Sequence, residues 1–156
     1  MTRLVSTTDI DVNPIDQTLT ILDEGSLLKV SRSGMVYPID QWLHTGCPNQ
    51  PHASRVSDCK SSLPDYAIGL SYSAWGELFV AAAIEGESSK TNLWNIRQGQ
   101  AGPELVTSLD RVASEILVLN DGNILLRYVS YYSSVLIQAI IHNTSHVATF
   151  GTFLAD

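Results

Sequence analysis

Both cysteines of the chain and two of its four histidines fall within one short segment, residues 44–59. As metal ligands they follow the order His44, Cys47, His52 and Cys59, a set of nitrogen and sulfur donors of the kind that structural zinc binds. The two cysteines can instead form a Cys47–Cys59 disulfide, which would contribute about 2–3 kcal/mol in an oxidising compartment. Two free thiols in a loop are the third interpretation. The sequence leaves all three open and predicts no cofactor apart from this zinc candidate.

Aromatic side chains are the second group that could bind a ligand. Trp75 stands beside Gly76 at a predicted turn tip, where a core position is difficult to arrange, so we expect its ring to be exposed. Tyr131 and Tyr132 precede two serines, a combination of rigid aromatic and small polar groups that is typical of adaptable binding surfaces. Alternation along a strand would instead bury one tyrosine of the pair. We predict Trp75, Tyr131, Tyr132 and Trp42 as binding residues.

Two further groups of residues imitate metal sites but lack essential ligands. His142 and His146 stand four apart, a spacing that brings two ligands together on a helix but not on a strand, and the glutamate of a metalloprotease helix is missing. Asp9, Asp11 and Asn13 begin like a calcium-binding loop, but a proline occupies the place where the sharp turn of that loop requires glycine. We expect exposed or capped histidines, and a solvated N-terminal strand or turn.

No arrangement typical of an enzyme is present in the sequence. It contains no nucleophile elbow, phosphate-binding glycine loop or dinucleotide fingerprint. The carboxylates of Glu85 and Glu87 lie in a hydrophilic segment that we expect at a hairpin tip, where no burial would shift a pKa for acid–base catalysis. We therefore predict that the chain is not an enzyme.

Composition narrows the class of protein. The 156 residues suffice for one domain, and 44% of them are hydrophobic whereas 16% are charged, which indicates a packed core. The net charge of −7 and the lack of any basic run argue against a nucleic-acid partner. The longest apolar stretches, Leu78–Ile84 and Val135–Ile141, are far shorter than the roughly 20 residues of a membrane-spanning helix. Since no signal peptide is visible either, we expect no membrane association, and a cytoplasmic or virion location.

Short runs of Val, Ile, Leu, Tyr and Thr, punctuated by Gly and Pro, predict many short strands. Three segments repeat the order strand, turn, strand around a central glycine, at Gly25, Gly76 and Gly122. These glycines stand 51 and 46 residues apart, close to the length of one four-stranded propeller blade. The stretch from Pro103 to Ile116 fits either a helix or another strand, turn, strand unit.

The repeats predict a single β domain over residues 1–156. We place them at about residues 15–43, 66–98 and 112–141, with the segment 44–59 as an insertion between the first two. The predicted fold class is all-β, with antiparallel sheets from about three propeller-blade-like repeats; a β-sandwich or a small barrel is the alternative. Since propellers typically have about four to eight blades, three repeats leave a ring incomplete.

The order of residues 70–99 matches that of a known repeat. A glycine turn at Gly76 leads through an apolar strand to Leu93, Trp94 and Asn95. This stretch resembles a WD-type β-propeller repeat, in which a glycine turn leads to a Leu-Trp-Asp closing strand. Asn95 replaces the aspartate here, and the Gly-His pair that opens such repeats is absent from all three copies. The resemblance implies propeller-like architecture and points to no particular protein.

These patterns predict a non-enzymatic binding or assembly module that mediates protein–protein interaction and self-associates. The expected partner is a protein, in a homo-oligomer or a larger assembly. A structural component of a virus or phage particle is one alternative, because the C-terminal run Val147–Leu154 could add to a neighbouring sheet edge. A carbohydrate-binding, lectin-like protein is the other, with Trp and Tyr rings stacking on sugars.

Overall fold

The computed structural model describes residues 4–38, 65–84, 86, 89–97, 103–129, 134–140 and 147–154. These residues form twelve β-strands and no helix, so the prediction of an all-β chain is confirmed. The strands are β1 (Thr7–Val12), β2 (Leu19–Asp23), β3 (Ser26–Val30), β4 (Val36–Pro38), β5 (Tyr66–Tyr72), β6 (Leu78–Ala83), β7 (Thr91–Ile96), β8 (Glu104–Leu109), β9 (Ala113–Val118), β10 (Ile124–Val129), β11 (Ser134–Ile140) and β12 (Val147–Leu154).

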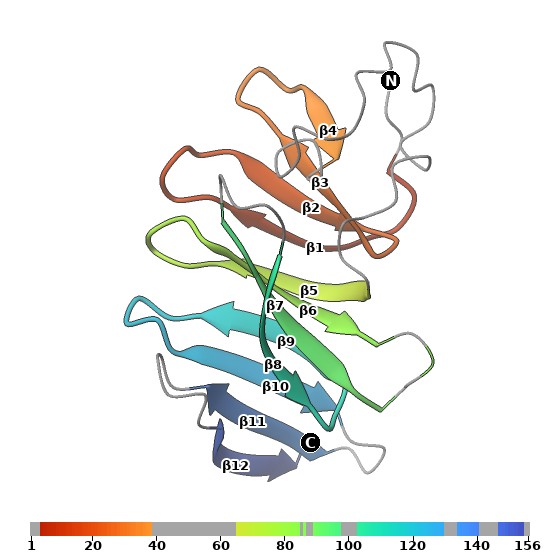
Figure 1. Ribbon diagram of the computed structural model, residues 1–156, viewed down its shortest axis with the longest axis vertical. Helices are drawn as coiled ribbons and strands as arrows, with labels where there is room; N and C mark the ends of the chain where they lie inside the picture. Colours follow the sequence, from red (N-terminus) through yellow and green to blue (C-terminus); the bar gives the residue numbers. More distant parts are fainter. Residues whose placement is uncertain are drawn as a thin grey trace.

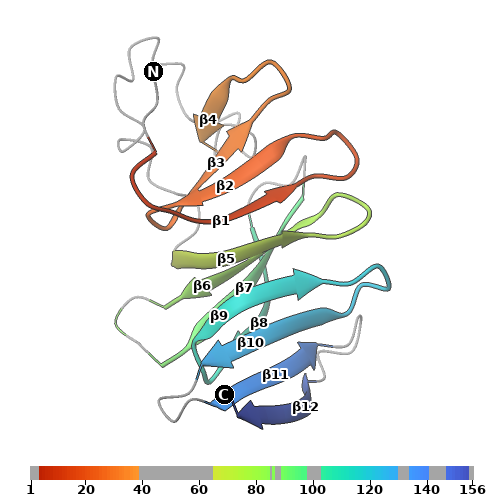
Figure 2. The same ribbon diagram turned by 180° about the vertical axis from the view of Figure 1, so that it is seen from behind.

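The strands form three antiparallel sheets of four strands each, which stack along the long axis of the molecule (Figures 1 and 2). The first sheet has the order β1-β2-β3-β4, the middle sheet β5-β6-β7-β8 and the third sheet β9-β10-β11-β12. Every strand therefore pairs with its neighbour in sequence, and each sheet is a four-stranded meander. This is the strand order of a propeller blade, and it confirms the predicted antiparallel, blade-like sheets.

Each sheet packs on the next chiefly through its first strand, since β1 lies against β5 and β5 lies against β9. Alternation along β6 explains how the middle sheet serves both neighbours. Leu78 and Val80 belong to the core shared with the first sheet, whereas Phe79 and Ala81 belong to the core shared with the third. The middle sheet is therefore apolar on both faces, and the sequence of its strand β6, Leu78–Ala83, is a continuous apolar run.

The stretch of residues 103–116 contains β8 and the beginning of β9, not a helix. The four apolar residues that would share a helical face are divided between two environments. Leu109 and Ile116 are buried, whereas Leu105 and Val112 are exposed. The strand, turn, strand interpretation of this stretch is therefore the right one.

The glycine turns do not all occupy the same place in their sheets. Gly76 and Gly122 lie between the first and second strands, whereas Gly25 lies between the second and third strands of its sheet. Gly25 and its neighbour Glu24 both have positive φ, 75° and 47°, as a two-residue hairpin turn requires. The longer loop of Gly76 and Gly122, in which the glycine N–H donates to the carbonyl three residues earlier, recurs in the first sheet at Gly34. The alignment on Gly25 is thus displaced by one strand.

The repeat boundaries at about residues 15–43, 66–98 and 112–141 stay a prediction. The three sheets themselves extend over residues 7–38, 66–109 and 113–154. The segment predicted as an insertion lies outside the described residues.

Candidate binding site at the hairpin tips

The first hairpins of the three sheets end on the same side of the molecule. Their turns follow one another along the stack, at the left in Figure 1 and at the right in Figure 2. The residues that close them pair in the same way: Val12 with Leu19, Tyr72 with Leu78, and Val118 with Ile124. The three turns are therefore equivalent, and we call this side the hairpin-tip side.

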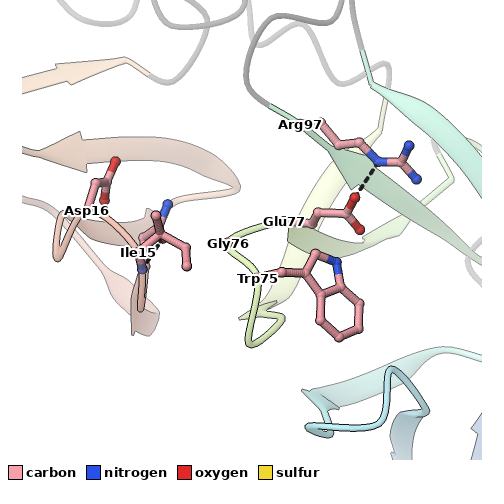
Figure 3. Close-up of a pocket in the computed structure, with 7 residues that line it drawn as sticks. Ile15, Asp16, Trp75, Gly76, Glu77 and Arg97 are labelled. Carbon is pink, nitrogen blue, oxygen red and sulfur yellow. Dashed lines mark hydrogen bonds and ion pairs between the residues drawn. The ribbon is translucent and has the colours of Figure 1, made fainter.

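A pocket of about 260 Å³ lies between the first two of these turns (Figure 3). Its lining comes from three elements. The lining residues are Asn13, Ile15 and Asp16 of the β1–β2 turn, Trp75, Gly76 and Glu77 of the β5–β6 turn, and Arg97 directly after β7.

Side-chain hydrogen bonds hold the β1–β2 turn in its conformation. The buried Asn13 accepts a hydrogen bond from the Ile15 N–H at its Oδ1, at 2.9 Å. Asp16 accepts from the Thr18 N–H at 2.9 Å, and its other oxygen accepts from the buried Lys29 Nζ at 3.2 Å. Partial burial acts to raise the pKa of the Asp16 carboxyl, but these hydrogen bonds and the Lys29 charge outweigh it and lower the pKa below its ordinary value. The turn is therefore built around an ionised, fully engaged carboxylate.

Gly76 allows the two turns to approach closely. Its φ is +86°, a conformation that side chains other than glycine rarely adopt. A Cβ at this position would lie 2.8 Å from Cγ1 of Ile15 and 3.0 Å from Oδ1 of Asn13. Glycine is thus required here for two reasons: the positive φ of the backbone and the close contact with the β1–β2 turn.

Glu77 is oriented by neighbours on its own sheet. Its Oε1 pairs with Nε of Arg97 at 2.7 Å, the dashed contact in Figure 3, and its Oε2 accepts from Nδ2 of the buried Asn95 at 3.3 Å. Its N–H donates to Oγ of Ser73 at 3.0 Å. Both carboxylates of the pocket are therefore paired with a cation, Glu77 with Arg97 in the lining and Asp16 with the buried Lys29 behind it.

Apolar surface remains open on both turns. Trp75 is 42% exposed and Ile15 is 65% exposed, and they line the same pocket from different sheets. The lining residues include no hydroxyl, thiol or imidazole that could act as a nucleophile or as a base near neutral pH. Exposed aromatic and aliphatic side chains framed by paired charges can instead bury an apolar side chain of another molecule.

Of the four predicted binding residues, only Trp75 belongs to the part of the chain that the structure describes. Trp42, Tyr131 and Tyr132 lie outside it, so their roles stay predictions. The same holds for the zinc and disulfide candidates and for the histidine pair, namely His44, Cys47, His52, Cys59, His142 and His146. Within the described ranges, no three His, Cys, Asp or Glu side chains are grouped as a metal site would need. No helix there has the length and apolar character to cross a membrane.

The carboxylates near the N-terminus have a different role from the one expected. Asp9 and Asp11 are not simply solvated, because both connect the first sheet to the middle sheet. Oδ2 of Asp9 accepts from the Leu70 N–H at 2.8 Å, and Oδ2 of Asp11 accepts from the Tyr72 N–H at 2.7 Å. Both side chains are half-buried between β1 and β5. The sequence alone does not show this role, because the role depends on the stacking of these two strands.

Only Trp75 of the seven lining residues was predicted as a binding residue. The other six are Asn13, Ile15, Asp16, Gly76, Glu77 and Arg97. Nothing in their spacing brings position 15 next to position 76, because the approach depends on the packing of two sheets. The one usable signal was a glycine directly after an exposed tryptophan, which marks a turn that another segment can approach.

Comparison with known proteins supports the fold. Neither a protein family model nor a curated protein matches the sequence. Among solved structures, the β-propeller domain of Myceliophteria thermophila Cps50 (Swd1) aligns with a TM-score of 0.51 and 10% identity over 94% of this chain and 45% of its own. The RRP9 WD40 repeats align at 0.48 and 15% identity over 99% and 40%, and U3-55K at 0.48 and 17% over 99% and 41%.

This chain thus spans less than half the length of each of these structures. At such low identity the alignment with the Swd1 domain bears on the fold alone. It extends the likeness from residues 70–99 to nearly all of the chain, and it agrees with the three stacked meanders. The chain therefore has the blade architecture of a β-propeller.

Proposed function

We propose that this chain is a protein-binding module, and that the pocket on its hairpin-tip side receives an apolar side chain from a partner protein. The observation that carries the proposal is the placement of Trp75 and Ile15. Two exposed apolar side chains from different sheets line one pocket, and the turns that bear them are fixed by Gly76 and by the bonds of Asn13.

The rigidity of the turns favours binding, because little conformational entropy is lost when a partner docks on preorganised side chains. The paired charges around the pocket favour an uncharged anchor with polar neighbours over a strongly ionic ligand. Asp16, paired with the buried Lys29, and Glu77, paired with Arg97, form a polar rim of this kind. A short peptide segment with one large apolar residue fits this chemistry.

A non-enzymatic role, with a protein partner, is part of the same proposal. The particle-component and lectin-like alternatives, like the cytoplasmic or virion location, stay predictions, because no contact among the described residues favours them. Self-association concerns a different surface, the two outer faces of the sheet stack.

The test is a selection of peptides from a random phage-displayed library on the immobilised chain, followed by calorimetric titration of the selected peptides. We expect peptides with one conserved apolar anchor. Trp75→Ala should weaken their binding about 30-fold, since a central aromatic residue typically contributes about 2 kcal/mol or more. Ile15→Ala should weaken it less.

Met35→Ala is the matched control, because Met35 is also an exposed apolar residue on a turn but does not line the pocket. Its peptide affinity should equal that of the original chain. Peptides that bind Trp75→Ala as tightly as the original chain would place the binding surface elsewhere. A glycan array that responds to the chain and not to Trp75→Ala would favour the carbohydrate alternative instead.

A further inference from the structure

The inner strands of the three sheets contain equivalent positions. The residue that directly precedes the hairpin-tip turn is Val12 in β1, Tyr72 in β5 and Val118 in β9. The residue before it is Asp11, Ser71 or Leu117. These positions lie where one sheet packs on the next.

The two junctions within the chain use the same hydrogen bond. At the first junction, Oδ2 of Asp11 accepts from the Tyr72 N–H at 2.7 Å. At the second, Oγ of Ser71 accepts from the Val118 N–H at 3.1 Å. In both, an acceptor on the preceding sheet satisfies the N–H at the equivalent position of the following sheet.

The outer faces of the first and third sheets present the two halves of a third junction. Val12 is 50% exposed and Ile10 53% exposed, whereas their equivalents in β5 and β9 are buried. Leu117 is 53% exposed, whereas its equivalent Ser71 is buried. On the first strands, apolar side chains are thus exposed at both ends of the stack, at positions that are covered inside it. Further along the face of Ile10, Ile21 and Leu28 are buried, so the open surface of the first sheet is that of β1.

The two end faces are compatible in their hydrogen bonding, because one offers no acceptor and the other needs none. Leu117 has no acceptor to offer to a following sheet. Val12 needs none, because its N–H already donates to Oδ1 of Asp11 at 2.7 Å, and the Ile10 N–H donates to Oδ1 of Asp9 at 2.8 Å. A contact between Leu117 and Val12 would therefore bury apolar surface and leave no unpaired N–H at these positions.

We propose that two copies of this chain join head to tail, with β9 of the third sheet in one copy packing against β1 of the first sheet in the other. The contact continues the packing already seen between β1, β5 and β9. Two such junctions close a ring of six sheets, which lies within the range of about four to eight blades that propellers have. The closure is that of a symmetric dimer.

The test is the mass of the purified chain in solution, measured by multi-angle light scattering across a concentration series. We expect twice the 17.0 kDa of one chain. Val12→Lys and Leu117→Glu should each yield monomers, with a dissociation constant raised at least roughly 100-fold, because each places an unpaired charge in the junction. Both residues are exposed in the single chain, so the variants should retain its circular dichroism spectrum.

The double variant Val12→Lys with Leu117→Glu separates this arrangement from any other. In a head-to-tail dimer the new lysine of one copy meets the new glutamate of the other at both junctions, so the dimer should return. Leu105→Lys, which changes an exposed apolar residue on β8, is the control and should leave the dimer unchanged.

Three outcomes would overturn the proposal. A strict monomer at every concentration would mean that something other than a second copy covers these faces. A dimer that survives Leu117→Glu would use another interface. Higher oligomers without a dimer would rule out closure by two copies.

Discussion

At position 76 the chain has no room for a side chain, and this single residue determines how closely the two pocket turns approach. Glycine at Gly34 has a similar φ, +80° against +86°, but nothing lies within 4 Å of the place where its Cβ would be. Alanine substitutions at Gly76 and Gly34 therefore distinguish the cost of the left-handed backbone from the cost of a clash with the neighbouring turn.

We predict that Gly76→Ala destabilises the chain more than Gly34→Ala does. Both should cost about 1–2 kcal/mol for the left-handed backbone. Gly76→Ala should cost about 1 kcal/mol more, since its Cβ would displace Ile15 and press on the buried Asn13. Urea unfolding of the two variants measures the difference. Equal midpoints would show that the β1–β2 turn accommodates the added methyl group without cost.

Tyr128 is the second informative residue. Its side chain is buried, and its hydroxyl has no hydrogen-bond partner among the described residues. Burial disfavours the phenolate and raises the pKa of Tyr128 to about 12, although the charge of Arg111 acts in the opposite direction. The folded chain thus binds this proton more tightly than the unfolded chain does.

A pH dependence follows from this. Because the folded pKa is raised from 10.0 to about 12, the stabilising contribution of Tyr128 is complete below pH 10 and is lost as the pH rises towards 12. Tyr128→Phe should remove this alkaline loss and leave the stability at neutral pH equal or slightly higher, since no hydrogen bond among the described residues is broken. Denaturant unfolding at both ends of that range tests it. An unchanged alkaline slope in Tyr128→Phe would assign the loss to another group.

The sequence predicts the strands themselves better than it predicts their order within each sheet. The apolar runs and glycine turns of the sequence identify most hairpins, because alternation and positive φ are local properties. The displaced alignment on Gly25 shows the limit of this approach. A two-residue turn and a five-residue loop can both carry a glycine, and spacing alone does not say which strand comes first in a sheet. The pocket and the bonds of Asp9 and Asp11 depend on contacts between sheets, which no local pattern contains.

The bond between β5 and β9 can be tested with two serines. Ser71→Ala removes the acceptor of the Val118 N–H in a buried junction, so we expect a loss of about 1–3 kcal/mol. Ser33→Ala, at an exposed serine pair with Ser31, should change stability by no more than about 0.5 kcal/mol. Thermal unfolding compares the two, and amide exchange at Val118 should accelerate only in Ser71→Ala. Equal effects would mean that the junction bond is not stabilising.

For the whole molecule, the arrangement of the sheets predicts a gradient of local stability. Among the described residues, the middle sheet has apolar cores on both faces, whereas on β10 of the third sheet the face away from the middle sheet carries the exposed Arg127 and the half-buried Leu125. We expect the amides of β6 and β7 to exchange more slowly than those of β10, although all three strands are paired on both edges.

Hydrogen exchange on the monomeric Leu117→Glu variant is the suitable measurement, because dimerisation would cover the end faces. Exchange as slow in β10 as in β6 and β7 would contradict the gradient. In the original chain the difference should shrink as the dimer forms.

The junction bonds give the stack a direction. The acceptor always stands on the earlier sheet and the backbone donor on the later one, as with Asp11 to Tyr72 and Ser71 to Val118. The side chain before each turn thus determines whether the following sheet receives a hydrogen bond at this position. An aspartate at position 117 would give the third sheet the same acceptor that Asp11 gives the first, so a sheet packed on it could be bonded as β5 is bonded to β1.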